Sequence, residues 1–225
     1  MRGSLTGVYI GHQTMAAPGD MPEELQLDSA KSHFNRGLWI GGTGKNMYAN
    51  RISFCFDFKG PSFVMDTACS SSLLAFDIAV TDIRLGKCDQ AIVGTAQINN
   101  KPFTNYIFQN NQFNAKDGIS KVWDKEADGF VRGESVSCVL LQKKGDAKRI
   151  YATVIHTKNN VDGYKKSGSF FPSKDLQQRL MENTYIEAGI NPHEIGYFEA
   201  HGTGTKAGDP EEAEAIYRAF CKDRK

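Results

Sequence analysis

Apolar runs along this chain come in two kinds, short runs bounded by turn residues and longer segments with apolar positions at helical spacing. The short runs predict buried β-strands at residues 6–11, 63–65, 90–97, 135–141, 150–157 and 195–200. The longer segments predict helices at residues 23–34, 47–52, 73–85, 103–113 and 174–188, and from residue 209 to the end. Because strands alternate with helices, the pattern favours an α/β sheet.

Several helix boundaries carry capping residues. Ser173 precedes the segment that ends near residue 188, and Gly189 follows it as a C-terminal stop. Asp209, Pro210 and Glu212 predict a second helix start, with Asp209 as the cap and proline at the first position. In the segment 103–113, we expect three aromatic side chains to pack, namely Tyr106, Phe108 and Phe113.

A glycine-rich stretch at residues 41–44 raises the question of a phosphate-binding loop. It lacks the Gly-Lys-Ser/Thr ending of such loops, so a turn before the helix at 47–52 is the favoured interpretation. Residues 18–22 and 114–129 are predicted loops, and the second of these holds Trp123.

Composition and charge exclude several classes of partner. The chain has 225 residues, 40% hydrophobic and 24% charged, as expected for one or at most two globular domains. A net charge of +1 gives no electrostatic reason to expect nucleic acid or membrane partners. Five cysteines without metal-ligand spacing, and no apolar signal peptide core, favour reduced thiols and a cytoplasmic location.

Cys69 is the strongest candidate for chemistry. It falls between the predicted strand at 63–65 and the helix at 73–85, followed by Ser70, Ser71 and Ser72, which are good N-cap residues. A cysteine at a strand-to-helix turn lies near the positive end of the helix dipole, which favours the nucleophilic thiolate. The alternative is a small buried hydrophobe without chemical role, which is common for free cysteine.

A cysteine nucleophile in acyl transfer needs an imidazole and hydrogen-bond donors for an oxyanion. His201 is the best partner, because it ends the predicted strand at 195–200 and begins a turn with two glycines and two threonines. The other histidines lack such a context, and we expect surface or packing roles for His12, His33, His156 and His193.

Two long motifs resemble the active-site signatures of β-ketoacyl synthases, the condensing enzymes of fatty acid and polyketide synthesis. They are D-T-A-C-S-S-S at 66–72 and E-A-H-G-T-G-T-K-A-G-D-P at 199–210. Further similar segments follow in the family's order at 50–62, 129–134 and 160–163, so the resemblance covers essentially the whole chain. The segments D-F-K-G-P-S and S-F-F-P-S are more similar to the animal multifunctional fatty acid synthase than to polyketide synthases.

The resemblance implies a thiolase-like αβαβα sandwich and a decarboxylative condensation. Cys69 would take an acyl group from a carrier-protein phosphopantetheine or from CoA, and the enolate of malonyl carrier protein would then attack it. His201 would assist decarboxylation, and the backbone N–H of Cys69 would be one oxyanion donor. No metal or redox cofactor is required by this chemistry, and the resemblance implies a homodimer that uses the strand before Cys69.

Other residues receive supporting roles from the same resemblance. Thr203 and Thr205 would shape the His201 loop along the pantetheine path. Asp209 and Glu212 would support the site, although helix capping explains both equally well. We expect a structural ion pair near the site between Arg132 and Glu134.

The resemblance also identifies departures. The family's second catalytic histidine, its lysine and a glycine-rich segment follow the His201 motif in the family and are not found here, and its first strands precede this chain's start. We therefore expect residues 1–225 to be a partial condensing domain that is acylated at Cys69 without turnover. The alternatives are a piece of a polyketide synthase and a non-catalytic fragment that dimerises or accepts an acyl group.

Overall fold

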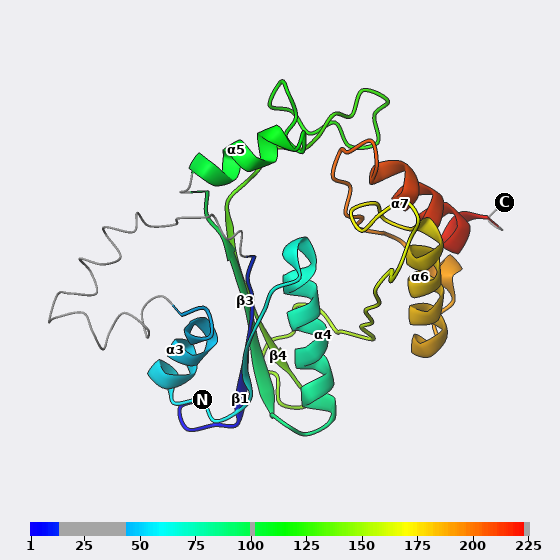
Figure 1. Cartoon of the computed structure of the whole chain (residues 1–225). Helices are drawn as coiled ribbons and strands as arrows, with labels where there is room; N and C mark the ends of the chain where they lie inside the picture. The colour runs from blue at the N-terminus through cyan, green and yellow to red at the C-terminus, as the bar shows by residue number, and fades with distance from the viewer. Residues whose placement is uncertain (14–43, 100–101, 223–225) are drawn as a thin grey trace, which may run out of the picture. The chain divides into compact units, whose positions relative to one another are not determined.

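The computed structural model describes residues 1–13, 44–99 and 102–222 of the chain. These residues form two compact units, each built from two stretches of sequence (Figure 1). Unit 1 comprises Met1–Thr104 and Gly133–Thr153, and unit 2 comprises Asn105–Arg132 and Val154–Lys225. The helix expected at 23–34, the loop at 18–22 and His33 lie outside the described residues.

A four-stranded mixed sheet forms the centre of unit 1. Its strands are β1 (Thr6–Gly11), β2 (Ser62–Met65), β3 (Gln90–Gln97) and β4 (Ser135–Gln142), in the order β2-β1-β3-β4. β1 runs parallel to β2 and β3, while β4 pairs antiparallel with β3. The predictions for these four strands are confirmed, as is the α/β class.

Helices α3 (Met47–Phe56) and α4 (Ser71–Arg84) cover opposite faces of this sheet (Figure 1). Successive β1 side chains point to opposite faces, so Tyr9 packs on α4 while Val8 packs on α3. The cluster beneath α4 consists of Tyr9, Ala75, Ala79, Ile83, Cys88, Ala91 and Val93. Small residues on α4 let the helix approach the strands closely, which fixes where its N-terminus, and thus Cys69, lies.

Unit 2 is organised by two helices, α6 (Lys174–Ala188) and α7 (Asp209–Ile216), and a π-helical turn, η3 (Tyr217–Cys221), continues α7. Its core forms around Phe220, whose ring contacts those of Tyr185 and Phe198 at centroid distances of 5.0 and 5.2 Å. Ser173 caps α6 by accepting from the backbone N–H of Leu176, and Gly189 ends it in a left-handed conformation, as predicted.

Other sequence predictions fail. The segments 150–157 and 195–200 are not strands, because neither joins the sheet or pairs within the described residues, and a short apolar run without a ladder partner forms no strand. α5 (Pro102–Asn110) ends earlier than predicted. Phe113 packs against Phe108 from the following loop, with ring centroids 5.8 Å apart, but the side chain of Tyr106 is exposed.

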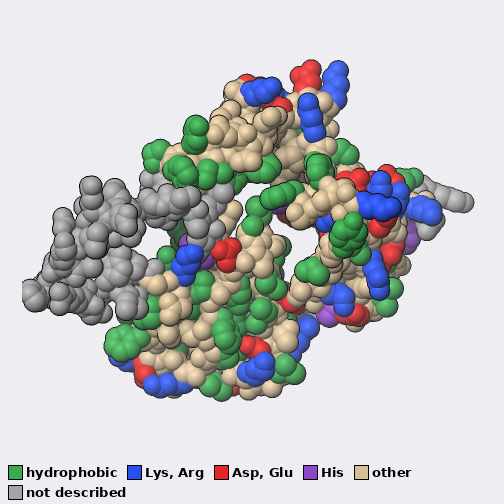
Figure 2. All heavy atoms as spheres, in the orientation of Figure 1, with side chains coloured by type: hydrophobic (Ala, Val, Ile, Leu, Met, Phe, Trp, Pro, Cys, Tyr) green, Lys and Arg blue, Asp and Glu red, His purple; other side chains and the backbone are tan. Residues whose placement is uncertain are grey.

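The surface agrees with the balanced composition. On the face shown in Figure 2, basic and acidic side chains are interspersed among the described residues. None of the helices in the described part of the chain is long and apolar enough to cross a bilayer.

A buried polar contact joins the central strand of unit 1 to α4. The hydroxyl of Tyr9 donates to Oδ2 of Asp82 at 2.8 Å, and Lys87 pairs with Oδ1 of the same carboxylate at 2.8 Å. Burial, followed by the hydrogen bond to Asp82, raises the pKa of Tyr9 well above its ordinary value. Both side chains are nearly inaccessible, so their hydrogen bond replaces hydration that folding has removed.

Replacing Tyr9 with phenylalanine should therefore destabilise unit 1, because Asp82 loses a partner that buried water cannot easily replace. We expect the free energy of unfolding in urea to fall by about 1–3 kcal/mol. The matched control is Tyr151→Phe, since Tyr151 is 84% exposed. Equal stability of the Tyr9→Phe and Tyr151→Phe proteins would contradict this role of the contact.

Candidate functional site

Cys69 lies in the turn that joins β2 to α4, as the sequence predicts. A short 3-10 turn, η1 (Ala68–Ser70), carries it, and α4 begins at Ser71. The side chain of Cys69 is exposed, whereas Cys88 in the same unit is buried. The alternative interpretation of Cys69 as a buried hydrophobe is therefore wrong.

The turn is held by the first residues of α4. The hydroxyl of Ser71 accepts from the backbone N–H of Thr67 at 2.8 Å and donates to the carbonyl oxygen of Ala68 at 2.7 Å. Ala68, directly before Cys69, has φ of 56°, in the left-handed region that non-glycine residues seldom occupy. Contacts that hold such a backbone are typical of functional turns.

The serine capping prediction is only partly correct. Ser70 occupies the N-cap position, but its hydroxyl makes no capping bond and donates instead to the carbonyl oxygen of Thr67 at 2.8 Å. The first N–H groups of α4, at the end of the helix next to Cys69, therefore donate no hydrogen bond to the Ser70 side chain.

Gly11 explains how closely this turn approaches the sheet. A Cβ at Gly11 would lie 2.7 Å from the backbone nitrogen of Ser72 and 2.9 Å from the carbonyl carbon of Ser71. The end of β1 thus lies directly beneath the start of α4, and only glycine fits there. The turn that carries Cys69 therefore lies against the sheet at the carboxyl ends of β1 and β2.

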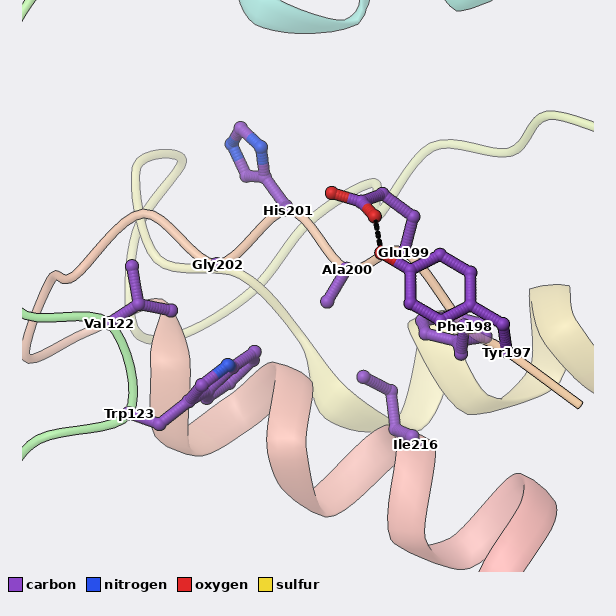
Figure 3. A pocket seen from close by; sticks show the side chains of 9 residues that line it. All are labelled: Val122, Trp123, Tyr197, Phe198, Glu199, Ala200, His201, Gly202 and Ile216. Atoms are coloured by element: carbon purple, nitrogen blue, oxygen red, sulfur yellow. Dashed lines mark hydrogen bonds between the residues drawn. The ribbon is translucent and has the colours of Figure 1, made fainter.

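His201 belongs to unit 2, where residues 201–205 form the loop that precedes α7. Gly202 and Gly204 have φ of 50° and 71°, so the loop follows a left-handed path that glycine adopts without strain. His201 is exposed, and its imidazole projects from this loop (Figure 3).

Two carboxylates from the first turn of α7 bind the backbone of this loop. Glu212 accepts from the N–H groups of His201 at 2.6 Å and Gly202 at 2.8 Å. Asp209 is 5% exposed and accepts from the N–H of Gly204 at 3.0 Å and of Trp123 at 2.9 Å. Three amides of the loop therefore donate to charged acceptors, which form stronger hydrogen bonds than neutral ones.

These contacts correct the capping prediction for Asp209. The N-cap of α7 is Gly208, and Asp209 is the first residue within the helix. Its carboxylate turns toward the His201 loop and the loop at Trp123 instead of capping α7.

The two threonines bond to each other within the loop. Their hydroxyl oxygens, Oγ1 of Thr203 and Oγ1 of Thr205, lie 2.9 Å apart, and Thr205 also accepts from the N–H of Gly208 at 3.1 Å. Both residues therefore shape the loop, and their place on the pantetheine path stays a prediction.

Arg132 and Glu134 lie in different units, and each has partners within its own. Arg132 donates to Oδ1 of Asn105 at 2.6 Å and lies over the ring of Phe108 at 4.7 Å. Oε1 of Glu134 accepts from the N–H of Asn99 at 2.6 Å. The ion pair expected between them stays a prediction.

A cavity of about 420 Å³ opens beside the His201 loop within unit 2. Its lining includes Val122, Trp123, Tyr197, Phe198, His201 and Ile216 (Figure 3). The hydroxyl of Tyr197 donates to the carboxylate of Glu199, which raises the pKa of the tyrosine. Sequence reasoning missed Trp123, whose left-handed backbone gives no local signal in the sequence.

The remaining described histidines have packing or surface contacts. His12 packs edge-on against Tyr48 at 4.9 Å, and burial lowers its pKa. His156 contacts the carboxylate of Glu187 at 3.1 Å. Within the described ranges, no group of three or more His, Cys, Asp or Glu residues could hold a metal ion.

Comparison with known proteins places this arrangement in a family. Residues 1–147 match the β-ketoacyl synthase N-terminal domain, and residues 151–225 match the β-ketoacyl synthase C-terminal domain. The chain is 43% identical over 222 residues to a fatty acid synthase from Anser anser anser, covering 99% of this chain and 61% of that protein. It is 40% identical over 231 residues to a highly reducing polyketide synthase from Didymella fabae, covering 12% of that protein.

Solved structures of ketosynthases also resemble this chain. The ketosynthase from module 6 of the bacillaene synthase of Bacillus subtilis 168 matches with a TM-score of 0.82 and 32% identity, over 98% of this chain and 37% of that one. The thiolase-like fold class is thereby confirmed, although the chain spans less than two thirds of each of these relatives. Two family domains that together match nearly every residue establish that the chain belongs to the β-ketoacyl synthase family.

Proposed function

We propose that this chain supplies the nucleophile and one histidine of a condensing reaction that extends an acyl thioester by two carbons. The observation that carries the proposal is Cys69, an exposed thiol on a left-handed turn at the start of a 14-residue helix, in a chain of the β-ketoacyl synthase family.

The reaction has two transfers. The Cys69 thiolate attacks the carbonyl carbon of an acyl thioester, a new S–C bond forms, the old C–S bond breaks, and the thiolate of CoA or of a carrier-protein phosphopantetheine leaves. Malonyl carrier protein then loses carbon dioxide, and the electron pair of the broken C–C bond gives an enolate. The enolate attacks the acyl-Cys69 carbonyl carbon, the Cys69 thiolate leaves, and a β-ketoacyl product remains on the carrier.

Each site residue has a role in this proposal. The backbone N–H of Cys69 stabilises the oxyanion of each tetrahedral intermediate, and His201 donates a hydrogen bond to the enolate oxygen. Asp209 and Glu212 hold the loop that carries His201, and the paired threonine hydroxyls shape it toward the pantetheine arm. The chemistry uses no metal or redox cofactor bound by this domain.

A fatty acid product is the first choice, and a polyketide is the second. The first is supported by the D-F-K-G-P-S and S-F-F-P-S segments and by 43% identity to an animal fatty acid synthase. The second is supported by polyketide synthases at 40% and 41% identity.

We also propose a homodimer in the cytoplasm. β2 lies at one end of the sheet order, with Phe63 half exposed, so it offers a strand for pairing with a second copy. All five cysteines are free thiols, which fits a reducing compartment.

Acylation of Cys69 is the direct test. Incubation with acyl-CoA should add one acyl group to the chain, detected by intact-protein mass spectrometry and mapped by peptide digestion. Cys69→Ser should abolish the adduct, because the hydroxyl does not ionise near neutral pH.

The matched controls are Cys55→Ser and Cys138→Ser, since both thiols are exposed but lie outside this turn. Both should load at the parental rate. Loading that persists in the Cys69→Ser protein, or that spreads over the three exposed thiols equally, would refute the nucleophile assignment.

Glu212→Ala tests the support of the His201 loop. Two backbone N–H groups lose a charged acceptor, so we expect the free energy of unfolding of unit 2 to fall by about 2 kcal/mol in urea. Glu214→Ala is the control on the same helix, because the Glu214 carboxylate forms a partly exposed ion pair with Arg218, and its loss should cost less than about 1 kcal/mol. Indistinguishable losses would show that Glu212 is only another surface carboxylate.

A further inference from the structure

Trp123 has a backbone conformation that large side chains rarely adopt. Its φ is 63°, in the left-handed region, where a Cβ crowds the neighbouring carbonyl oxygen. Such a conformation persists only where surrounding contacts determine it. For Trp123, one of these contacts is the hydrogen bond from its N–H to Oδ2 of Asp209 at 2.9 Å.

Asp209 connects this residue to the His201 loop. Its second oxygen, Oδ1, accepts from the N–H of Gly204 at 3.0 Å, so a single buried carboxylate binds both loops. A direct bond adds to this, since the N–H of Gly129 donates to the carbonyl oxygen of Gly204 at 3.0 Å. Segment 121–129 is therefore joined to the His201 loop from both of its ends.

The two loops also pack without space for side chains at the glycines. A Cβ at Gly202 would lie 3.0 Å from Cγ1 of Val122 and 3.6 Å from Cζ2 of Trp123. A Cβ at Gly204 would lie 3.0 Å from the carbonyl oxygen of Gly129. The glycines of the H-G-T-G-T motif thus suit the close approach of the segment beneath them as well as their own positive φ angles.

The indole of Trp123 provides the apolar part of this support. In Figure 3 it lies under the loop, next to α7, while the His201 imidazole points to the other side. The side chain is half exposed and lines the cavity, so it is not a core residue that the fold of unit 2 depends on.

We propose that Trp123 is a positioning residue for His201. Its indole and its left-handed backbone together determine where the backbone of residues 201–204 lies, and so where the His201 side chain is held. The proposal rests on the catalytic role proposed for His201, and it adds a residue that does not touch the reacting atoms. Loss of the indole should loosen the loop while the Asp209 contact to the Trp123 N–H is retained.

Amide hydrogen exchange of the ¹⁵N-labelled full chain, measured by NMR, tests this in Trp123→Ala and Trp123→Phe. The alanine variant should raise the exchange rates of the Gly202 and Gly204 amides at least about tenfold. The phenylalanine variant should stay within about threefold of the parent, because an aromatic ring still fills the space under the loop. The internal control is the amide of Gln177, which donates within α6 to Ser173 of the same unit.

If Trp123 only stabilised the fold of unit 2, Trp123→Ala would raise the exchange rate of the Gln177 amide together with those of the loop, and Trp123→Phe would not restore the parental rates. Either result would overturn the proposal. Unchanged loop amides in Trp123→Ala would also overturn it. If Trp123→Ala does not fold, Gly202→Ala tests the same packing from the other side and should raise exchange at the Trp123 amide; an unchanged amide there would contradict the proposal.

Loading of Cys69 with acyl-CoA in the parent chain separates this inference from the proposed function. The loading step uses Cys69, whereas His201 acts in the condensation that follows, so loading and loop exchange report on different residues. A parent chain that does not load would contradict the proposed function and leave the exchange result intact.

Discussion

The His201 loop depends on two carboxylates, which accept the backbone hydrogen bonds that carbonyl groups accept in a helix or a sheet. Residues 201–205 belong to no helix or strand, so their backbone N–H groups need other acceptors. Glu212 and Asp209 accept from three of these N–H groups, and Asp209 also accepts from that of Trp123 in the segment beneath the loop. Both carboxylates lie in the first turn of α7, where acidic side chains also suit the helix dipole. The loop, the segment beneath it and the helix are thereby fixed as one piece, and the position of His201 follows from that.

The turn that carries Cys69 is also held by a side chain of the helix that follows it, but here the side chain is a neutral hydroxyl. Ser71 in the first turn of that helix ties down the backbone of Thr67 and Ala68. In both places a strained or glycine-containing turn is held by side chains that follow it in the sequence. This arrangement places the side chains of Cys69 and His201 on turns that are held in one conformation, as the proposed acyl transfer requires.

Sequence reasoning succeeded where the signal was local. The strands β1 and β3, the Ser173 cap and the strand-turn-helix placement of Cys69 each follow from a few neighbouring residues. It failed where the outcome depends on distant partners. The apolar run at 150–157 could not show that no strand lies beside it in the described residues. Asp209 was predicted as a helix cap because its actual partners, Trp123 and Gly204, are distant in sequence or outside the helix and are brought to it by folding.

The most direct test of the account is amide hydrogen exchange at His201, Gly202, Gly204 and Trp123 in the Glu212→Ala and Asp209→Ala proteins. Glu212→Ala removes the acceptor of the His201 and Gly202 amides, and Asp209→Ala removes that of the Gly204 and Trp123 amides, so each pair should exchange at least about tenfold faster in its own variant. The amide of Gln177, which donates to a backbone carbonyl oxygen, should keep its exchange rate. Loop amides with unchanged exchange in both variants, while the chain stays folded, would contradict the claim that carboxylates of α7 hold the His201 loop.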